Sequence, residues 1–422
     1  MSNVAIIYSR PNEMKDSRFG FSEHWALLGT VLHNVGHKVV LLDYSVERFD
    51  KNHFLALLQK ELIQLIVIEF DSFTIKRSEN DRHGNEIIRL VHEHYPNVKI
   101  VAYGHYCCIT DKDVFNTDYT VKTNNLNDIL FAVHDVLPEC FQKFSFDSPD
   151  DVPFIDRQFL CEQVEFLNQN RKSTLICTAH GCENTCTFCH RQSFQSKYLS
   201  RSDESVLSEF AILQQQGFIN VWITDDNFTF NLTRAKRILT ALVEQKIIAE
   251  MKIAISSWMN IDEEFLDIAK RANIKIISFG IESSDEEILR FYKKKNNLEQ
   301  VKRIVHYADS IGIFTVGNFI IGAPMETNET IENTFAFIRD CGFDQIHIKT
   351  LVYMQGSRIY ENLPPNLKNT TFQFACKENG LNSFALNDLT VIKKKFLDRY
   401  YEERSITTKQ KIEKYGIPFE KS

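Results

Sequence analysis

The chain has 422 residues, of which 43% are hydrophobic and 25% are charged, and its formal net charge is −7. This composition is ordinary for a globular protein, and the length exceeds what one small core requires, so we expect two domains. The acidic balance excludes a general electrostatic attraction to nucleic acid or to an anionic membrane surface.

Targeting signals are not evident in the sequence. No apolar run reaches the ~18 residues of a membrane-spanning helix, and the start M-S-N-V-A-I-I-Y-S lacks the basic and long apolar regions of a signal peptide. Unpaired cysteines such as Cys341 and Cys376 fit a reducing compartment. We therefore expect a cytoplasmic protein without a membrane partner.

Residues 1–140 alternate short apolar runs with amphipathic stretches. Strands are predicted at 4–8, 38–43, 65–70, 99–103 and 118–121, and helices at 22–35, 86–95 and 126–136. This alternation predicts βαβ units in a doubly wound (Rossmann or flavodoxin-like) parallel sheet, whose ligands bind outside the carboxyl ends of the strands. No G-x-G-x-x-G follows the first strand, which argues against a dinucleotide site.

A second unit follows a linker at 141–171, which contains the Asp-, Ser- and Pro-rich stretch D-S-P-D-D-V-P. Residues 172–352 repeat a strand–helix pattern six times, with strands predicted at 174–177, 220–224, 251–257, 275–281, 314–322 and 345–350. In β/α barrels the chemistry is expected at the carboxyl ends of such strands. Residues 353–422 are expected to form a C-terminal helical extension, with a basic, aromatic helix at 389–404 covering the barrel.

Three cysteines follow the first strand of this second unit in a C-x3-C-x2-C spacing: Cys182, Cys186 and Cys189. Gly181 and Asn184 favour a loop, in which the thiolates can converge. Sulfur ligands of this kind suit zinc or an iron–sulfur cluster.

The two metals differ in the ligands they need. Structural zinc usually has four ligands, with its cysteines in spaced pairs, and the sequence has no second C-x2-C pair. A non-catalytic zinc protein nevertheless stays open as an alternative, because Cys177, His180 or His190 could complete a tetrahedron. A four-iron cluster on three cysteines would leave one iron open to another ligand.

The C-x3-C-x2-C motif, with Phe188 before its last cysteine, resembles the signature of the radical S-adenosylmethionine (SAM) enzymes. The resemblance implies a partial (β/α)6 barrel and a [4Fe-4S] cluster on the three cysteines, with SAM bound at the open iron. One electron from the cluster would cleave SAM to methionine and a 5′-deoxyadenosyl radical. It also implies an external electron donor of the flavodoxin or ferredoxin type.

Other family motifs imply contacts to SAM. D-D-N-F resembles a segment with an acidic contact to the SAM amino group, which assigns Asp225 and Asp226, although Asp226 could simply cap a helix. G-I-E-S assigns Glu282 and Ser283 to the methionyl and ribose parts, although a Glu after a strand is often a cap or a solvated residue.

The adenine of SAM is assigned to two further positions. Phe188 is expected to contact it, and the G-x-P-x-E-T motif places Gly322 where the backbone can approach the base. The same motif also fits a tight strand-to-helix turn with Thr327 as N-cap. No side chain is assigned as the donor or acceptor of hydrogen.

The N-terminal layout looks like the cobalamin-binding domain found in one large subgroup of these enzymes. The motif D-x-H-x-x-G is absent, since His33 and Gly36 supply only its H-x-x-G part. Bulky residues stand at 69–73 and 104–108, where corrinoid sites usually have small ones. The resemblance thus implies the fold and leaves open whether cobalamin binds.

The sequence therefore predicts a radical SAM enzyme that acts on an unactivated carbon of a small molecule or natural product. With cobalamin the expected reaction is methylation of carbon; without it, the expected reactions are dehydration, epimerisation, dehydrogenation or rearrangement. Modification of tRNA is a further alternative, which the acidic charge and the lack of an evident basic appendage disfavour.

Overall fold

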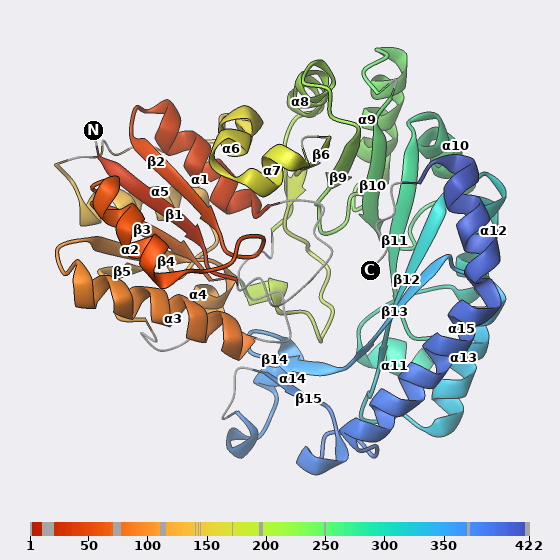
Figure 1. Ribbon diagram of the computed structural model, residues 1–422. Helices are drawn as coiled ribbons and strands as arrows, with labels where there is room; N and C mark the ends of the chain where they lie inside the picture. The colour runs from red at the N-terminus through yellow and green to blue at the C-terminus, as the bar shows by residue number, and fades with distance from the viewer. Residues whose placement is uncertain are drawn as a thin grey trace. The chain divides into compact units, whose positions relative to one another are not determined.

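The computed structural model describes residues 2–10, 21–70, 77–109, 115–139, 141, 143, 145–170, 172–193, 197–248, 250–368 and 372–417. The chain forms two compact units, Met1–Leu175 and Ile176–Ser422 (Figure 1). The predicted boundaries at 140, 171 and 352 stay predictions. Of the bulky stretch at 69–73, residues 71–73 lie outside the described residues.

The first unit is a parallel five-stranded sheet in the order β2-β1-β3-β4-β5. This is the doubly wound, flavodoxin-like order, as predicted. Its elements are β1 (Asn3–Tyr8), α1 (Glu23–Asn34), β2 (Lys38–Asp43), α2 (Lys51–Lys60), β3 (Leu65–Glu69), α3 (Arg77–His94), β4 (Lys99–Tyr103), α4 (His105–Ile109), β5 (Tyr119–Thr120), α5 (Leu126–Val136), α6 (Arg157–Gln163) and α7 (Glu165–Gln169).

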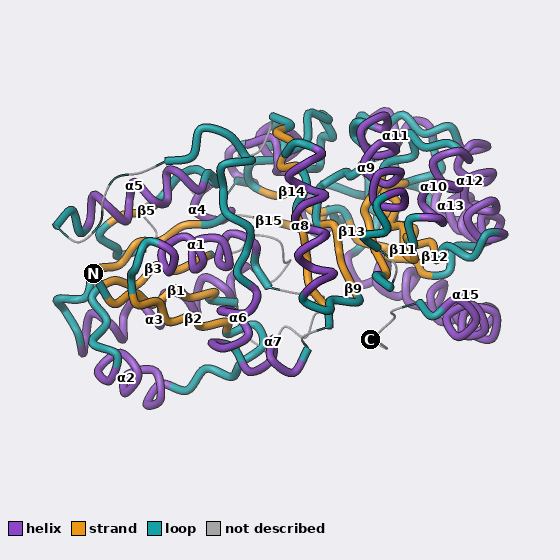
Figure 2. Tube along the Cα trace, turned by 90° about the horizontal axis from the view of Figure 1, so that it is seen from above, coloured by secondary structure: helices purple, strands orange, loops and turns teal. Residues whose placement is uncertain are grey.

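The strand residues of this sheet alternate between two covered faces. Val4, Ile6 and Tyr8 of β1 share a core with α1 and α5, which contact each other, while α2 and α3 lie on the other side (Figure 2). Helix α2 was not predicted, because it buries only Phe54 and Leu58 and its apolar stripe is correspondingly narrow.

The second unit contains a six-stranded sheet in the order β13-β12-β11-β10-β9-β6, with parallel pairing from β9 to β13. The predicted partial barrel is thereby confirmed. Its elements are β6 (Ser173–Ile176), β7 (Ala179–His180), η2 (His190–Ser193), β8 (Leu199–Ser200), α8 (Asp203–Gln215), β9 (Asn220–Ile223), α9 (Leu232–Glu244), β10 (Lys252–Ser257), α10 (Glu263–Arg271), β11 (Ile274–Glu282), α11 (Glu286–Phe291), α12 (Leu298–Ser310), β12 (Phe314–Ile321), α13 (Asn328–Cys341) and β13 (Gln345–Thr350).

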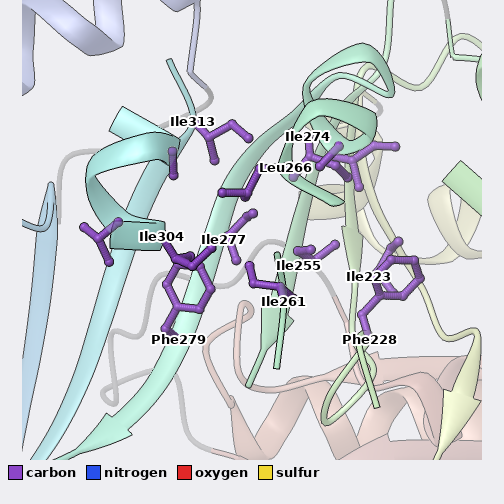
Figure 3. Packing of buried hydrophobic residues seen from close by; sticks show 14 of the residues in the cluster. Ile223, Phe228, Ile255, Ile261, Leu266, Ile274, Ile277, Phe279, Ile304 and Ile313 are labelled. Atoms are coloured by element: carbon purple, nitrogen blue, oxygen red, sulfur yellow. The ribbon is translucent and has the colours of Figure 1, made fainter. Parts of the chain in front are cut away.

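The core of the second unit lies between these strands and the inner faces of the helices (Figure 3). Ile255 of β10 and Ile277 of β11 point toward Leu266 of α10 and Ile304 of α12. Full burial of one such side chain contributes about 1.5–3 kcal/mol. Packing of this core therefore fixes the positions of the strand ends and of the loops that follow them.

The C-terminal part is more than a helical extension. A short antiparallel pair that the sequence did not predict, β14 and β15, precedes the long helix α15. The elements are β14 (Val352–Met354), α14 (Arg358–Glu361), η3 (Pro365–Leu367), β15 (Phe372–Phe374), η4 (Lys377–Asn379) and α15 (Leu386–Tyr415).

Helix α15 lies along the edge strand β13. Phe396 stacks on Phe335 of α13 with ring centroids 3.9 Å apart. The Tyr401 hydroxyl donates to the Ile346 carbonyl at 2.9 Å and accepts from the Ile346 N–H at 3.0 Å. The helix therefore satisfies backbone groups on a sheet edge that would otherwise be open.

A search of the described residues for helices both long and apolar enough to span a lipid bilayer finds none.

Candidate functional site

The loop that carries the three cysteines follows β6 and β7 in the second unit. Asp225, just after β9, anchors the segment that enters the loop. Its carboxylate accepts hydrogen bonds from the Thr178 N–H at 2.6 Å, the Ala179 N–H at 3.1 Å and the Thr178 hydroxyl at 2.6 Å. Arg234 of α9 donates to the Thr178 carbonyl at 3.1 Å. Asp225 is 3% exposed, and burial raises its pKa although these donors oppose the effect.

Thr187 anchors the loop between its second and third cysteines. Its N–H donates to the Tyr292 carbonyl at 3.2 Å, and its hydroxyl donates to the Phe291 carbonyl at 2.8 Å. The ring of Phe188 meets Tyr292 edge-on, with centroids 5.2 Å apart. The cysteine loop is therefore docked on the C-terminal turn of α11.

Cys182 and Cys186 lie between these anchors, and Cys189 follows Thr187. Cys186 is buried, and Cys182 and Cys189 are half-buried. The Asn184 amide donates to the Cys182 sulfur at 3.3 Å. Cys186 and Cys189 are joined through the backbone, since the Cys189 N–H donates to the Cys186 carbonyl at 3.2 Å.

Burial governs the ionisation of two of the loop thiols. Burial raises the pKa of Cys186 to about 12, and the charge of Lys294 opposes this effect. Burial also raises the pKa of Cys189, against the opposing charge of Arg191. In both cases the charge of a neighbouring cysteine raises the pKa further. Such thiols ionise when metal binds, and iron would supply the charge that they lack.

Asp226, beside Asp225, pairs with a residue that the sequence analysis did not single out. Its carboxylate lies 2.7 Å from the Arg191 guanidinium, and both side chains are mostly buried. Arg191 comes two residues after Cys189, so this ion pair ties the end of the cysteine loop to the end of β9.

Glu282 is the last residue of β11 and has a left-handed backbone, with φ +71°. The β11–β12 register shifts between Gly280 and Glu282. The carboxylate lies 3.2 Å from the ammonium of Lys294, whose side chain is 2% exposed. The strained backbone costs about 1–3 kcal/mol, a type of strain that clusters at functional sites.

Ser283 follows Glu282 and forms a local turn. Its hydroxyl accepts from the Asp285 N–H at 3.1 Å, and Asp285 in turn is the N-cap of α11. Ser283 is 2% exposed.

Gly322, after β12, has φ +99°, a conformation that favours glycine. Its N–H donates to the Glu326 carboxylate at 3.0 Å, and the Ala323 N–H donates to the same oxygen at 3.3 Å. Thr327 is the N-cap of α13 in a capping box with Thr330. The G-x-P-x-E-T motif is thus a turn closed by its own glutamate, and its threonine caps a helix.

The structure places the nine predicted site residues in the second unit, in loops or at strand ends. Sequence reasoning missed several buried polar partners around them. Their signals were weak: Arg191 and Arg234 lie in unremarkable stretches, and Lys294 lies in K-K-K-N-N, a run typical of a solvated surface. These partners are Arg191, Arg234, Lys294 and Glu326.

The carboxyl end of the N-terminal sheet was predicted to carry bulky residues. Glu69 accepts hydrogen bonds from the Ser22 hydroxyl at 2.7 Å and the Tyr103 hydroxyl at 2.9 Å. Phe70 packs on Phe115, with centroids 4.0 Å apart. Glu69 and Phe70 thus make their contacts inside the unit. Their size therefore neither supports nor opposes the binding of a corrin.

Comparison with known proteins identifies the second unit. Residues 176–338, which include all nine predicted site residues, match the radical SAM superfamily. These residues form a radical SAM domain. The predicted enzyme class, with a [4Fe-4S] cluster and SAM as the cofactors of the domain, is thereby confirmed at the level of the superfamily. Enzymes of this superfamily also need a reductant.

Two curated relatives are methyltransferases by name. An uncharacterized methyltransferase of Pyrococcus horikoshii is 27% identical over 58% of this chain and 54% of the relative. Cytidylyl-2-hydroxyethylphosphonate methyltransferase of Streptomyces wedmorensis is 30% identical over 43% of this chain and 36% of the relative. The matched regions thus span about half or less of these relatives.

A solved structure resembles more of the chain than the radical SAM domain. The radical SAM methyltransferase TsrM of Kitasatospora setae, solved with cobalamin and a [4Fe-4S] cluster, superposes with a TM-score of 0.67 at 18% identity. The match covers 83% of this chain and 75% of TsrM. At this identity the similarity shows the fold, which confirms the predicted layout of an N-terminal α/β domain before the radical SAM domain.

Proposed function

We propose that this chain cleaves SAM reductively and uses the product radical on an unactivated carbon of a small-molecule substrate. A [4Fe-4S] cluster on Cys182, Cys186 and Cys189 would supply the electron that splits SAM into methionine and a 5′-deoxyadenosyl radical. The proposal is carried by one observation: within the radical SAM domain, the three cysteines share a loop that is hydrogen-bonded to the core where it begins and at its centre.

The protein's own part in this chemistry is to hold position and exclude water. Asp225 and Arg234 fix the backbone that enters the loop, and Thr187 fixes its centre on α11. The Asn184 amide donates a hydrogen bond to the Cys182 sulfur and helps to hold it in place. Burial of Cys186 would limit the access of solvent to a cluster bound there.

The SAM contacts are proposed at the strand ends that follow. Asp226, which follows β9, would contact the SAM amino group. Glu282 and Ser283, at the end of β11, would contact the methionyl and ribose parts. Gly322 would bring backbone close to adenine, and Phe188, fixed against Tyr292, would cover it. Asp225 has its acceptor sites filled by Thr178 and Ala179, so its proposed role is to position the loop.

Cobalamin-dependent methylation of carbon is the finer proposal within this function. It is favoured by the similarity in fold to TsrM, which extends over 83% of the chain and thus includes residues of the N-terminal unit. We derive no step through cobalamin, because Glu69 and Phe70, at the carboxyl end of that sheet, are engaged by partners within the unit.

Anoxic reconstitution of the full chain tests the main proposal. We expect about four irons and four acid-labile sulfides per chain, and formation of 5′-deoxyadenosine and methionine when SAM and a strong reductant are added. The Cys186→Ser variant should lose the products, whereas Cys341→Ala, at a buried cysteine remote in sequence, should keep them. Zinc without sulfide would instead establish a zinc-binding protein and overturn the proposal.

A second experiment separates the two outcomes within the proposed function. The chain is reconstituted with hydroxocobalamin, desalted, and examined for corrin absorbance and for S-adenosylhomocysteine formed during turnover. Retained corrin together with S-adenosylhomocysteine supports methylation. Deoxyadenosine and methionine alone, with no retained corrin, would favour a cobalamin-independent radical reaction.

A further inference from the structure

A buried ammonium group lies at the carboxyl end of β11. The Lys294 side chain is 2% exposed, and its Nζ atom has three partners. It donates to the Gly280 carbonyl at 3.0 Å, lies 3.2 Å from the Glu282 carboxylate and sits 3.7 Å from the centroid of the Trp258 ring. A buried lysine is rare unless it is paired, and this one is held from three directions.

The backbone is shaped around this ammonium. A side chain on Gly280 would place its Cβ 2.8 Å from the Glu282 carboxylate and 3.1 Å from the Lys294 ammonium. The strained φ of Glu282 and the register shift beside it bring the carboxylate to the same place. Strand β11 therefore has a glycine, a left-handed residue and a register shift next to the charged pair. A surface ion pair needs none of these features.

The turn that carries Lys294 is the turn on which the cysteine loop docks. Thr187 donates to the carbonyls of Phe291 and Tyr292, two or three residues before Lys294. Thr187 itself stands between Cys186 and Cys189 in the sequence. The position of Lys294 relative to the cysteines is therefore set by hydrogen bonds.

Lys294 and Glu282 thus place two opposite, mostly buried charges beside the turn on which the cysteine loop docks. Charges act more strongly in a buried site than in water, since the effective dielectric constant is lower. One-electron reduction adds a negative charge to a cluster held by these thiolates, so the same two residues should act on that step with opposite signs.

We infer that Lys294 is a positioning residue that tunes the reduction potential of the cluster, with Glu282 as its opposing partner. The inference rests on the proposed function, because it requires a cluster at the three cysteines. The electron comes from the external one-electron donor, and it reduces the cluster from the 2+ to the 1+ state. Lys294 stabilises the added charge and makes this reduction easier, while Glu282 holds the ammonium in place.

The test is a redox titration of the reconstituted full-length protein, followed by electron paramagnetic resonance of the reduced cluster. Lys294→Met should shift the midpoint potential to a more negative value, and Glu282→Gln should shift it to a more positive one. Lys294→Arg keeps the charge and should stay close to the wild type. Lys295→Met removes the same charge from the exposed neighbouring residue, where water screens it, and should leave the potential unchanged.

The opposite signs distinguish tuning from structural damage. If Lys294→Met and Glu282→Gln shift the potential in the same direction, or if neither shifts it, the inference is wrong. If Lys294→Met fails to retain iron, the positive shift in Glu282→Gln and the unchanged value in Lys294→Arg still decide. A wild-type chain that assembles no [4Fe-4S] cluster would contradict the proposed function itself, before any variant is compared.

Turnover gives a second readout. With a weak reductant, Lys294→Met should form 5′-deoxyadenosine several-fold more slowly than the wild type, and a stronger reductant such as titanium(III) citrate should restore most of the rate. A deficit that persists with the strong reductant would contradict tuning and point to a loss of SAM positioning instead.

Discussion

At the scale of single residues, buried carboxylates do most of the positioning in the radical SAM domain. Asp225 receives three hydrogen bonds from the segment before the cysteine loop, and Glu326 receives two from the backbone of the turn after β12. Each carboxylate replaces the water that its donors lose on burial. Their first task is therefore to fix backbone, whatever they contribute to cofactor binding.

Replacement of Asp225 should destabilise the domain and loosen the cysteine loop. Asp225→Ala leaves three buried donors without an acceptor, so we expect a loss of about 1–3 kcal/mol in the free energy of unfolding and a lower iron content after reconstitution. Asp225→Asn keeps one acceptor oxygen and should lose less. Urea denaturation and iron analysis measure the two effects. Asp267→Asn, at an exposed residue, should change neither, and equal behaviour of the Asp225 and Asp267 variants would contradict the positioning role.

Glu326 should make stability depend on pH. Burial raises its pKa, so the folded state holds this proton more tightly than the unfolded state. The resulting stability is fully present below the pKa of an unfolded glutamate, about 4.3, and it is lost as pH rises through the higher folded pKa. Glu326→Gln cannot lose a proton, so its stability relative to the wild type should improve as pH rises from about 4 to about 8.

Urea denaturation of both proteins across this pH range measures the effect of Glu326. The matched control is Glu329→Gln, because Glu329 is exposed and lies one turn further along. Its stability relative to the wild type should not improve as pH rises, because an exposed carboxylate in the first turn of a helix pays no burial cost. A difference between wild type and Glu326→Gln that is flat, or that runs the other way, would show that burial does not govern this carboxyl group.

At the scale of elements, the loops that carry the site begin or end at capped helices. The clearest is α13, where Thr327 accepts from the Thr330 N–H at 3.1 Å and its own N–H donates to the Thr330 hydroxyl at 2.9 Å. Helix α13 follows the turn of Gly322 directly. The cap therefore sets where that turn stops, even though Thr327 itself is exposed.

Thr327→Ala should cost stability and spare the chemistry. Loss of the cap should lower the free energy of unfolding by about 1 kcal/mol, while Thr327→Ser, which keeps the hydroxyl, should stay near the wild type. The yield of 5′-deoxyadenosine from the reconstituted protein should be unchanged in both. A loss of product in Thr327→Ala without a loss of stability would show instead that the threonine contacts the cofactor.

At the scale of the whole molecule, the cofactors should contribute to folding stability. A ligand that binds only the folded state stabilises it by mass action, by about 2.7 kcal/mol at a hundred times its Kd. The cysteine loop supplies ligands that come together only in the folded domain. Its stability therefore depends on whether the cluster is present.

Thermal unfolding under anoxia checks this dependence. The reconstituted chain should unfold at a higher temperature than the chain stripped of iron by a chelator, and added SAM should raise the temperature further. In Cys186→Ser both increments should disappear, because the cluster lacks one ligand. An increment from SAM that survives in Cys186→Ser would place SAM binding away from the cluster.

Much of this architecture could be predicted from local pattern. The strands at 38–43, 99–103 and 345–350 match β2, β4 and β13 residue for residue. In β2 and β4 the signal is the continuous apolar run of a buried parallel strand, and in the edge strand β13 it is the alternation of buried and exposed residues. The three cysteines could likewise be recognised as ligands from the sequence, since a short ligand spacing is a local property of the chain.

The partners of these residues depend on tertiary structure. Lys294 stands in a basic run that looks like solvent-exposed surface, yet its ammonium is enclosed by Trp258, which follows β10, and by Gly280 and Glu282 of β11. The sequence around Asp225 does not show whether its carboxylate binds a cofactor or a loop. Only the fold brings it to Thr178, which lies 47 residues away in the chain. The sequence by itself determined which elements form and which side chains can hold a cluster, because periodicity and spacing are local. Which charges face one another was decided by the packing of strand ends, because burial and long-range contacts exist only once the chain is folded.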